Sequence, residues 1–368
     1  MNSPVIHHSS PITPPGNVLI IVARRIGDVL LATPLIRSVK HAWPGAAIDV
    51  LVFEGTQAVL AANPDVRRVL AVPERPGWMA HLVFILRLLR RYDVALSTQH
   101  GDRPTLYAFF AGRWRAGLLR PFRKEWWKRY LLNRWILFDD FNTHTVRMHL
   151  ALAELLGIAP AGEVVVGWNA EEAQGVARLL GDGGEKPLAV LHPYPNFNYK
   201  MWHPEAWIEV ARWLAARGLR IALSGGGNAS ELAYVDSLVR AMPAGTINAA
   251  GKLTLGSSAN LVSRARIYIG PDTSMTHIAA ALGVPTVALY GPTNCVKWGP
   301  WPRGHAADAN PWRRLGTQRR GNVVLLQGTI ACVPCHLEGC DRHVESYSDC
   351  LQQLPAARVI AAVEEIIG

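Results

Sequence analysis

The sequence predicts an α/β protein built from two similar halves, each organised around a parallel sheet. Three observations support this class. The chain has 368 residues, whereas an ordinary domain has about 100 to 200. Short apolar runs alternate with amphipathic stretches, which is typical of strands and helices in a parallel sheet. A glycine-rich segment, LLGDGGEKP, interrupts the alternation, so we expect a linker near residues 160 to 186 and a cleft between the halves.

The first half is expected over residues 17 to 165. Its elements are predicted in the order NVLIIV, VLLATPLIRSVKHAW, AIDVLVF, QAVLAAN and RRVLAV. Residues 1 to 16 have neither the basic start nor the apolar stretch of a secretory signal, so we interpret them as a flexible lead-in. Between about residues 101 and 140 the alternation breaks.

The second half is expected over residues 186 to 350. Its runs are PLAVLHP, PEAWIEVARWLAARG, RIALSGG, ELAYVDSLVRAM, ARIYIG, MTHIAAALG and TVALYG. Gly218 and Gly283 follow two predicted helices, where a left-handed backbone favours glycine. The segment from 351 to 368 ends in AARVIAAVEEIIG, which predicts a closing amphipathic helix.

Composition limits the partners. A hydrophobic content of 49% with 18% charged residues is ordinary for a soluble globular enzyme and excludes general disorder. The formal charge of +10 and the pI near 9.6 favour a polyanionic partner, namely nucleic acid, an anionic membrane or a phosphorylated substrate. The run HLVFILRLL contains Arg87 and is about half of the roughly 20 residues that span a bilayer. We therefore expect a cytosolic protein.

The turn after the first predicted strand carries Asp28, within ARRIGDVLLATPLIRSVK. One interpretation is a helix N-cap, which contributes about 1 kcal/mol. The other follows from position, since ligands of open α/β sheets bind beyond the carboxyl ends of the strands. There, a carboxylate can act as a general base.

The stretch IGPDTSMTHIAAALG is predicted to run from a strand through a turn into a helix. The helix N-terminus would hold an anion through its free N–H groups, helped by the hydroxyls of Thr273, Ser274 and Thr276. The alternative is a Ser/Thr cap on a buried helix, with His277 as a core histidine.

Two further loops of the second half are candidates for the same ligand. Lys200 lies in a polar, aromatic loop just before a helix expected near Pro204, where it would neutralise a pyrophosphate or remain solvated. The segment LSGGGNASELAYV lets a ligand approach the backbone, but it is no G-x-G-x-x-G motif, and the chain has no G-x-x-x-x-G-K-[ST].

A basic, tryptophan-rich stretch spans residues 113 to 135. It contains Arg113, Arg115, Arg120, Arg123, Lys124, Lys128, Arg129 and Arg134, interleaved with Trp114, Trp126, Trp127 and Trp135. It is either a solvated helix with core tryptophans or a surface for a polyanion. Single-stranded nucleic acid would also suit it, but no RNA- or DNA-binding motif accompanies it.

Four of the five cysteines form the pattern C-x2-C-x4-C-x9-C at Cys332, Cys335, Cys340 and Cys350. A structural zinc or iron site is chemically plausible, with His336 and His343 as spare ligands. Free thiols and a disulfide remain the alternatives.

Together these segments resemble glycosyltransferase family 9, the ADP-heptose:lipopolysaccharide heptosyltransferases. The resemblance rests on VARRIGDVLLATPLIRSVKHAWPGAAIDVLV, the loop with Lys200 and Trp202, IGPDTSMTHIAAALGVPTVALYGPT and the following WGPW. It covers about residues 17 to 302 and is strongest to the branch that adds the third heptose of the inner core. It implies a GT-B fold of two Rossmann-like, doubly wound domains that face an interdomain cleft, with acceptor in the first and ADP-heptose in the second.

The resemblance also implies roles for individual residues. The family's Gly-Asp pair matches Gly27 and Asp28, so Asp28 is expected to be the catalytic base. Donor diphosphate and sugar are expected at Lys200, Asp272, Thr273, Ser274 and His277, and the ribose at Glu231. The acceptor is expected at Arg25, Arg113, Arg115, Arg120, Arg123 and Lys124, because lipopolysaccharide cores carry phosphates and acidic sugars. Ser-Met follows Asp-Thr where many relatives have Gly-Leu or Ala-Pro.

No Asp-x-Asp element occurs in the sequence, so we expect inverting, metal-independent transfer that needs no catalytic cofactor. The expected partners are ADP-heptose, lipopolysaccharide inner core and the cytoplasmic surface of the inner membrane, with no nucleic acid. One alternative is a family-9 enzyme with another nucleotide sugar or a protein acceptor. An alternative of another class is a non-catalytic protein that binds nucleotide sugars or polyanions.

Overall fold

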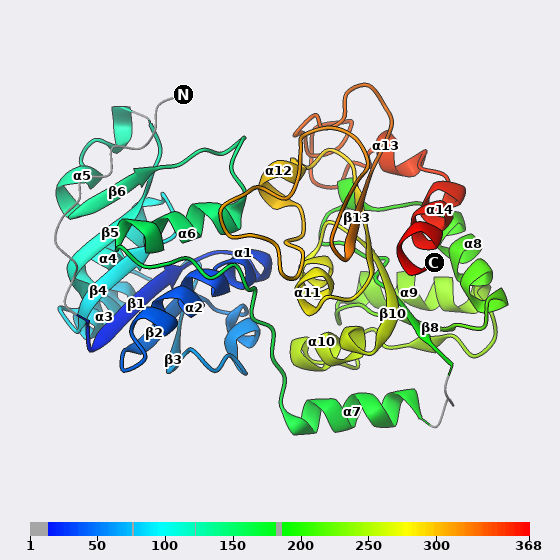
Figure 1. The fold of residues 1–368 in the computed structure, drawn as a ribbon, viewed down its shortest axis with the longest axis horizontal. Helices are drawn as coiled ribbons and strands as arrows, with labels where there is room; N and C mark the ends of the chain where they lie inside the picture. The colour runs from blue at the N-terminus through cyan, green and yellow to red at the C-terminus, as the bar shows by residue number, and fades with distance from the viewer. Residues whose placement is uncertain (1–13, 76, 122, 182–185) are drawn as a thin grey trace. The chain divides into compact units, whose positions relative to one another are not determined.

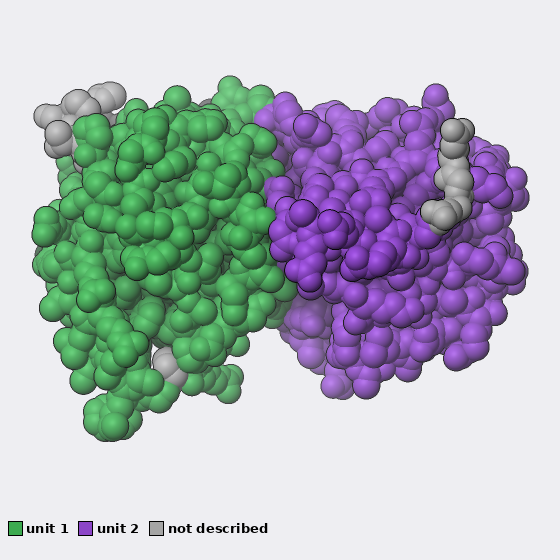
Figure 2. Space-filling view, turned by 90° about the horizontal axis from the view of Figure 1, so that it is seen from below, with its two compact units in different colours: residues 1–165, 306–309 green, residues 166–305, 310–368 purple. Residues whose placement is uncertain are grey.

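The computed structural model describes residues 14–75, 77–121, 123–181 and 186–368. The chain divides into two compact units, coloured separately in Figure 2. Unit 1 contains the described residues up to Val165 together with Ala306–Ala309. Unit 2 contains Val166–His305 and Asn310–Gly368.

Unit 1 is built on a parallel sheet in the order β3-β2-β1-β4-β5-β6. The strands are β1 (Asn17–Val22), β2 (Ala47–Phe53), β3 (Arg68–Val72), β4 (Tyr92–Ser97), β5 (Gly112–Leu119) and β6 (Arg134–Leu137). This order is that of a doubly wound Rossmann sheet. Residues 18–22 of β1 are fully buried, which explains why the first strand reads as an uninterrupted apolar run.

Helices cover this sheet (Figure 1). They are α1 (Ile26–Leu31), α2 (Thr33–Ala42), α3 (Trp78–Leu88), α4 (Asp102–Ala111), α5 (Lys128–Leu131) and α6 (Thr145–Leu155), with short 3-10 helices η1 (Gln57–Leu60) and η2 (Arg123–Glu125). Helix α2 packs against α6, and α3 packs against α4. The expected helix over QAVLAAN is therefore only one 3-10 turn.

The region from 101 to 140 continues the α/β pattern instead of breaking it. Its basic stretch is divided among β5, η2, α5 and β6, so the interpretation as one solvated helix is wrong. Strand β5 pairs with β4 and β6, and its burial comes from these distant neighbours. Because its residues include several charged side chains, such a strand lacks the apolar pattern by which strands are predicted from sequence.

Unit 2 contains a seven-stranded sheet in the order β12-β13-β11-β10-β7-β8-β9. The strands are β7 (Leu188–Leu191), β8 (Arg220–Leu223), β9 (Ile247–Asn248), β10 (Ala265–Pro271), β11 (Thr286–Tyr290), β12 (Gln318–Arg320) and β13 (Val323–Gln327). Among the described strand pairs of this sheet, β12 and β13 at the edge are antiparallel and the others are parallel. The remaining order again follows the Rossmann scheme.

The helices of unit 2 include α7 (Ala170–Leu180), α8 (Pro204–Ala216), α9 (Ala229–Ala241), α10 (Leu255–Ser263), α11 (Ser274–Leu282), α12 (Cys295–Trp298), α13 (Asp349–Gln352) and α14 (Ala356–Ile367), with the 3-10 helix η3 (Asn198–Lys200). The expected starts near Pro204 and Ala356 are confirmed. Helix α14 packs against α8. Gly283 has φ +79° at the end of α11, as its position predicted.

Helix α7 lies where the sequence analysis expected only a linker. Asn169 caps it by accepting a 2.9 Å hydrogen bond from Glu172 N–H, and the Glu172 carboxylate accepts one of 2.9 Å from Asn169 N–H. This reciprocal capping box is a local signal that the sequence contains. Thr254 Oγ1 also donates to Glu172 at 2.5 Å, which attaches α7 to the start of α10.

None of the described helices is both long and apolar enough to cross a bilayer.

Candidate functional site

In each sheet, the strand order reverses between two central strands. From one of them the following strands are added on one side, and from the other they are added on the opposite side. These switch points lie between β1 and β4 in unit 1 and between β7 and β10 in unit 2. Ligands of open α/β sheets bind outside the carboxyl ends of the strands at such points. The side chains that follow these strands are therefore the candidate site of each unit.

In unit 2, Asp272 directly follows β10, and Lys200 reaches it from η3. Lys200 Nζ lies 2.5 Å from Asp272 Oδ2. Lys200 Nζ also donates to the backbone oxygen of Asp272 at 3.4 Å. The other carboxylate oxygen, Oδ1, accepts a 3.3 Å hydrogen bond from the hydroxyl of Tyr290, at the end of β11.

Burial is the largest single influence and would raise the pKa of Asp272, but the charge of Lys200, the electrostatic effect of His277 and the side-chain hydrogen bonds together hold the pKa below its ordinary value. The carboxylate is thus ionised at neutral pH. Lys200 also lies beside the rings of Phe197 and Tyr199, at 6.0 and 5.7 Å from their centroids. An oriented lysine at a strand's carboxyl end provides positive charge for an anionic ligand.

His277 lies in the first turn of α11, with Nε2 3.9 Å from Asp272 Oδ1. It is buried, and burial lowers its pKa to about 4, although Asp272 acts in the opposite direction. The ring is therefore neutral at neutral pH. Its Nδ1 is buried and has no hydrogen-bond partner among the described residues, so the hydrogen-bonding capacity of this atom is unused in the structure.

The N-terminus of α11 begins at Thr273, which is the N-cap and makes no side-chain cap bond. Thr273 and Ser274 are partly exposed. Thr276 is fully buried, and its hydroxyl donates to Pro271 O at 2.5 Å. Thr276 is thus a packing residue, and the expectation that its hydroxyl helps to hold an anion is wrong.

Glu231 lies in the first turn of α9 and faces the glycine turn after β8. Its carboxylate accepts from Gly226 N–H at 2.6 Å and from Asn228 Nδ2 at 3.0 Å. Burial raises its pKa, although the bond from Gly226 lowers it. The side chain therefore fixes the shape of the glycine turn.

A buried pair that the sequence analysis missed lies between Lys200 and Glu231 along this sheet edge. His192 follows β7, and its Nδ1 lies 3.0 Å from Ser224 Oγ, which follows β8. Burial lowers the pKa of His192 to about 4. A signal was available, because both residues directly follow predicted strands, but their pairing depends on which strands are neighbours.

In unit 1, Asp28 is inside the first turn of α1, and the N-cap is Arg25. The interpretation of Asp28 as an N-cap is therefore wrong. Asp28 as a whole residue is 7% exposed, and its Oδ2 lies 3.7 Å from Arg24 Nε. Arg24 and Arg25 are exposed. The arrangement gives a largely buried carboxylate beside exposed positive charge.

The end of β4 supplies His100 to the same edge, a residue that the sequence analysis missed. Thr98 Oγ1 donates to Ile21 O at 2.8 Å, which joins the ends of β4 and β1. Burial lowers the pKa of His100, and the charge of Arg120 lowers it further. Arg120 in turn pairs with Asp140 at 2.8 Å.

The other expected acceptor-binding residues differ in exposure. Arg113 and Lys124 are exposed. Arg115 is partly buried over the Phe109 ring, 5.2 Å from its centroid, and burial lowers its pKa, which is typical of a packing residue. The side chain of Arg123 lies outside the described part of the chain.

The sequence model of the family described as glycosyltransferase family 9 (heptosyltransferase) matches residues 83–314. The chain belongs to this family. The match includes the residues around Lys200, Glu231 and Asp272. The expectation of a glycosyltransferase is confirmed.

Individual proteins agree with the family. Lipopolysaccharide heptosyltransferase 3 of Escherichia coli K12 is 28% identical over 286 residues, which are 75% of this chain and 82% of that protein. Among solved structures, a family 9 glycosyl transferase from Veillonella parvula has a TM-score of 0.76 at 19% identity, covering 96% and 97% of the two chains. The E. coli heptosyltransferase WaaC with ADP has a TM-score of 0.70 at 23% identity, covering 95% and 99%. The expected GT-B type with Rossmann-like domains is confirmed.

The five cysteines of this family 9 enzyme all lie in described segments, and all are free. The disulfide alternative is therefore wrong for this structure. Burial and the three neighbouring thiols raise the pKa of Cys350 to about 12. Across the described chain, no group of three or more His, Cys, Asp or Glu side chains is arranged to hold a metal ion.

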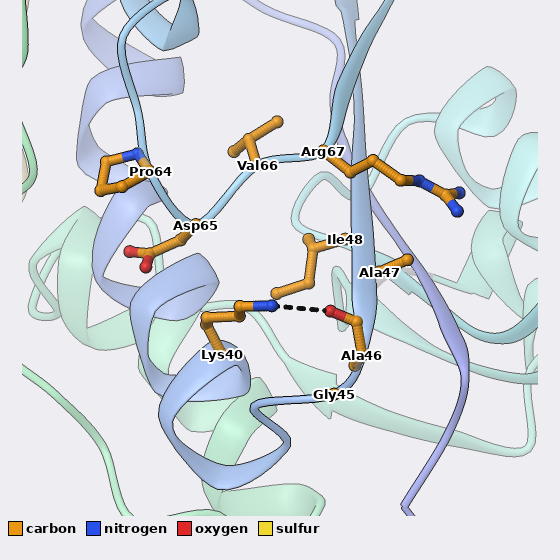
Figure 3. A pocket seen from close by; sticks show the side chains of 9 residues that line it. All are labelled: Lys40, Gly45, Ala46, Ala47, Ile48, Pro64, Asp65, Val66 and Arg67. Atoms are coloured by element: carbon orange, nitrogen blue, oxygen red, sulfur yellow. Dashed lines mark hydrogen bonds between the residues drawn. The ribbon is translucent and has the colours of Figure 1, made fainter.

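A hollow of about 280 Å³ lies in unit 1, away from the candidate site (Figure 3). It is lined by Lys40, Gly45, Ala46, Ala47, Ile48, Pro64, Asp65, Val66 and Arg67. These residues lie at the amino ends of β2 and β3, opposite the edge that carries Asp28. Lys40 Nζ already donates to Ala46 O at 3.0 Å. We assign no ligand to this hollow.

Proposed function

We propose that the enzyme transfers heptose from ADP-heptose to the inner core of lipopolysaccharide in an inverting, metal-independent single displacement. The names of its relatives support the sugar and the acceptor, and the ADP of the similar WaaC structure supports the nucleotide. The similarity to heptosyltransferase 3 favours the third heptose of the core. The absence of an Asp-x-Asp element from the sequence supports metal independence.

The observation that carries the proposal is the pairing of Lys200 with Asp272 beside the N-terminus of α11. That helix start makes no side-chain cap bond, so its N–H groups point toward a ligand at the positive end of the helix dipole. Lys200 adds a full charge. This combination stabilises negative charge on a departing diphosphate. Thr273 and Ser274 contact that diphosphate, and neutral His277 donates to the diphosphate or the sugar.

The neighbouring glycine turn is the proposed binding site for the nucleoside part of the donor. Gly225, Gly226 and Gly227 carry no side chains that would keep a ligand away. Glu231 lies under this turn and accepts from its backbone. We propose that a ribose hydroxyl donates to the free lone pairs of the Glu231 carboxylate.

Asp28 is proposed as the general base. Its carboxylate takes the proton of the acceptor hydroxyl while that oxygen bonds to the anomeric carbon of heptose. The bond from the anomeric carbon to the diphosphate oxygen breaks, and ADP leaves with the bonding electrons. One displacement from the face opposite the leaving group inverts the anomeric centre. Arg24 Nε lies 3.7 Å from Asp28 Oδ2, so a positive charge stands beside the proposed base.

The acceptor carries phosphates and acidic sugars, so basic side chains of unit 1 are proposed to bind it. Arg25, Arg113 and Lys124 are exposed for this contact, and Arg120 lies at the edge near His100. Arg115 and Arg123 remain predictions. We also propose that the enzyme works in the cytoplasm, peripheral to the inner membrane, and that nucleic acid is no partner.

A structural zinc or iron at Cys332, Cys335, Cys340 and Cys350 stays a prediction. Metal analysis of the purified chain tests it, with the Cys332→Ser and Cys350→Ser variants as comparisons. Stoichiometric metal lost in both variants would support the site.

The proposed function is tested by a donor screen that measures ADP release. ADP-heptose, UDP-glucose and GDP-mannose are each offered with core oligosaccharides truncated at successive heptoses, in the presence and absence of EDTA. We expect release only with ADP-heptose and an acceptor that lacks the third heptose, unchanged by EDTA. Turnover with another nucleotide sugar would show that the enzyme uses a donor other than ADP-heptose. Binding of ADP-heptose without turnover on any acceptor would favour a non-catalytic protein.

A further inference from the structure

Helix α3 is apolar on the face that packs inward and also on the face that points to solvent. Its inner residues Phe84, Ile85 and Leu88 join the core of unit 1, and the Phe84 ring lies 5.7 Å from that of Tyr107 on α4. This packing holds the helix rigidly against its neighbour. An ordinary surface helix has charged and polar residues on its outer face.

The outer face of α3 instead carries large apolar side chains. They recur at helical spacing and are Trp78 (77% exposed), Met79 (62%), Leu82 (50%), Val83 (47%) and Leu86 (58%), followed by Leu89 (48%) just after the helix. Single exposed apolar residues are normal on proteins, but a contiguous patch marks an interaction site. We therefore expect a partner to cover the outer face of α3.

Positive charge borders this face. Arg87, Arg90 and Arg91 follow one another at the end of the helix, and all are exposed. Glu74, before the helix, has Arg75 beside it. A short apolar face bordered by arginines, with a tryptophan at its start, is the pattern of a helix that lies in the interface of an anionic bilayer. Eleven residues are too few to span one.

We propose that the outer face of α3 is the membrane-docking surface of this enzyme, with anionic phospholipid as its partner. Trp78, Leu82 and Leu86 enter the headgroup region, and Arg87, Arg90 and Arg91 contact lipid phosphates. Helix α3 follows β3, so its first residues lie at the edge of the sheet where Asp28 also lies. In one respect this inference rests on the proposed function, since a lipid-linked acceptor explains why docking is useful.

The test uses the full chain and vesicles of phosphatidylcholine with or without phosphatidylglycerol, in a flotation assay. The wild type is expected to bind the vesicles that contain phosphatidylglycerol and to be released by salt. The triple variant Trp78→Ser, Leu82→Ser, Leu86→Ser is expected to bind them at least about tenfold more weakly. Leu315→Ser, which changes a leucine of unit 2 that is 63% exposed, is the matched control and is expected to bind like the wild type.

A second variant separates charge from apolar contact. Arg87→Glu with Arg91→Glu keeps the apolar face and is expected to lose the preference for phosphatidylglycerol. Unchanged vesicle binding by the triple variant, with native circular dichroism, would overturn the proposal. A wild-type dimer that the triple variant converts to monomer, without vesicle binding by either, would overturn it in favour of a second copy.

The activity assay distinguishes this proposal from the proposed function. With a lipid-free core oligosaccharide, the triple variant is expected to release ADP at the wild-type rate. If the wild type binds anionic vesicles through α3 but releases no ADP with any acceptor, the docking surface stands and the heptosyltransferase function fails.

Discussion

Lys200 Nζ lies 2.5 Å from Asp272 Oδ2, and this ion pair joins the loop after β7 to the end of β10. Both side chains are mostly buried, at 18% and 9% exposure. Each charge depends on the other, because an isolated buried charge is costly while a paired one is tolerated. The Lys200–Asp272 pair is therefore expected to contribute both to stability and to donor binding, and experiments can separate the two contributions.

Replacing Lys200 by methionine leaves the Asp272 carboxylate buried without its main cation. We expect a loss of about 3 kcal/mol in the free energy of unfolding, with ADP binding weakened at least about tenfold. Adding Asp272→Asn is expected to restore most of the stability but none of the ADP affinity. Urea unfolding and calorimetric ADP titration measure both. Lys252→Met, at an exposed lysine, is the control, and equal ADP affinity in Lys200→Met would contradict the role of Lys200.

The buried histidines of unit 2 make stability dependent on pH. Burial lowers the pKa of His277 and of His192 from 6.5 to about 4, so between these values the unfolded chain binds protons that the folded chain does not. Stability is fully present above about pH 6.5 and falls as the pH decreases toward 4, by up to about 3 kcal/mol for each histidine. Asp272, whose pKa is lowered from 3.8, adds its own loss only below this window.

Urea midpoints measured from pH 7.5 to pH 4.5 check this dependence. The His277→Gln variant is expected to show a shallower decline than the wild type, because one of the two groups is gone. His41→Gln removes an exposed histidine and is expected to leave the slope unchanged. A slope in His277→Gln that equals the wild-type slope would show that His277 titrates normally.

The Asp28→Asn variant tests the base without changing the shape of the side chain. A general base contributes about 10²- to 10⁴-fold to rate, so we expect turnover to fall by a factor in that range. ADP affinity should stay at the wild-type value, because the residues proposed to bind ADP all belong to unit 2. Asp236→Asn, at an exposed position on α9, controls for loss of charge. Wild-type turnover in a correctly folded Asp28→Asn variant would refute the role.

The sequence predicted those parts of the fold whose signals are local. The apolar run of β1 and the left-handed glycine after α11 are local, and both are confirmed. The placement of Lys200 before Pro204 was also visible, because a polar loop precedes a strong helix signal.

The missed features depend on contacts between distant residues. Strand β5 reads as a charged segment because its burial comes from β4 and β6. The pairing of His192 with Ser224 requires β7 and β8 to be neighbours. Thr276 looked like a ligand residue, yet its helix turns the hydroxyl inward to Pro271. Helix α7 is the exception, since its capping box was readable from Asn169 and Glu172.

The glycine turn after β8 gives the last prediction, because two adjacent glycines differ in surroundings. A Cβ on Gly226 would come within 2.7 Å of Glu231 Oε2, whereas the nearest atom to a Cβ on Gly227 is a Gly251 Cα at 3.8 Å. Gly226→Ala must therefore displace the Glu231 carboxylate, which also accepts from Gly226 N–H at 2.6 Å. Gly227→Ala adds the same methyl group without that conflict.

We expect Gly226→Ala to weaken ADP binding by about tenfold, close to the effect of Glu231→Ala, since both remove one charge-assisted hydrogen bond to the ribose. Gly227→Ala should bind ADP within about twofold of the wild type, because it leaves that bond intact. Calorimetric titration with ADP and with 2′-deoxy-ADP measures the ribose contribution directly. If Glu231 contacts the ribose, the wild type discriminates between the two nucleotides and Glu231→Ala does not. Equal discrimination in both proteins would place the ribose elsewhere and leave Glu231 as a support for the turn alone.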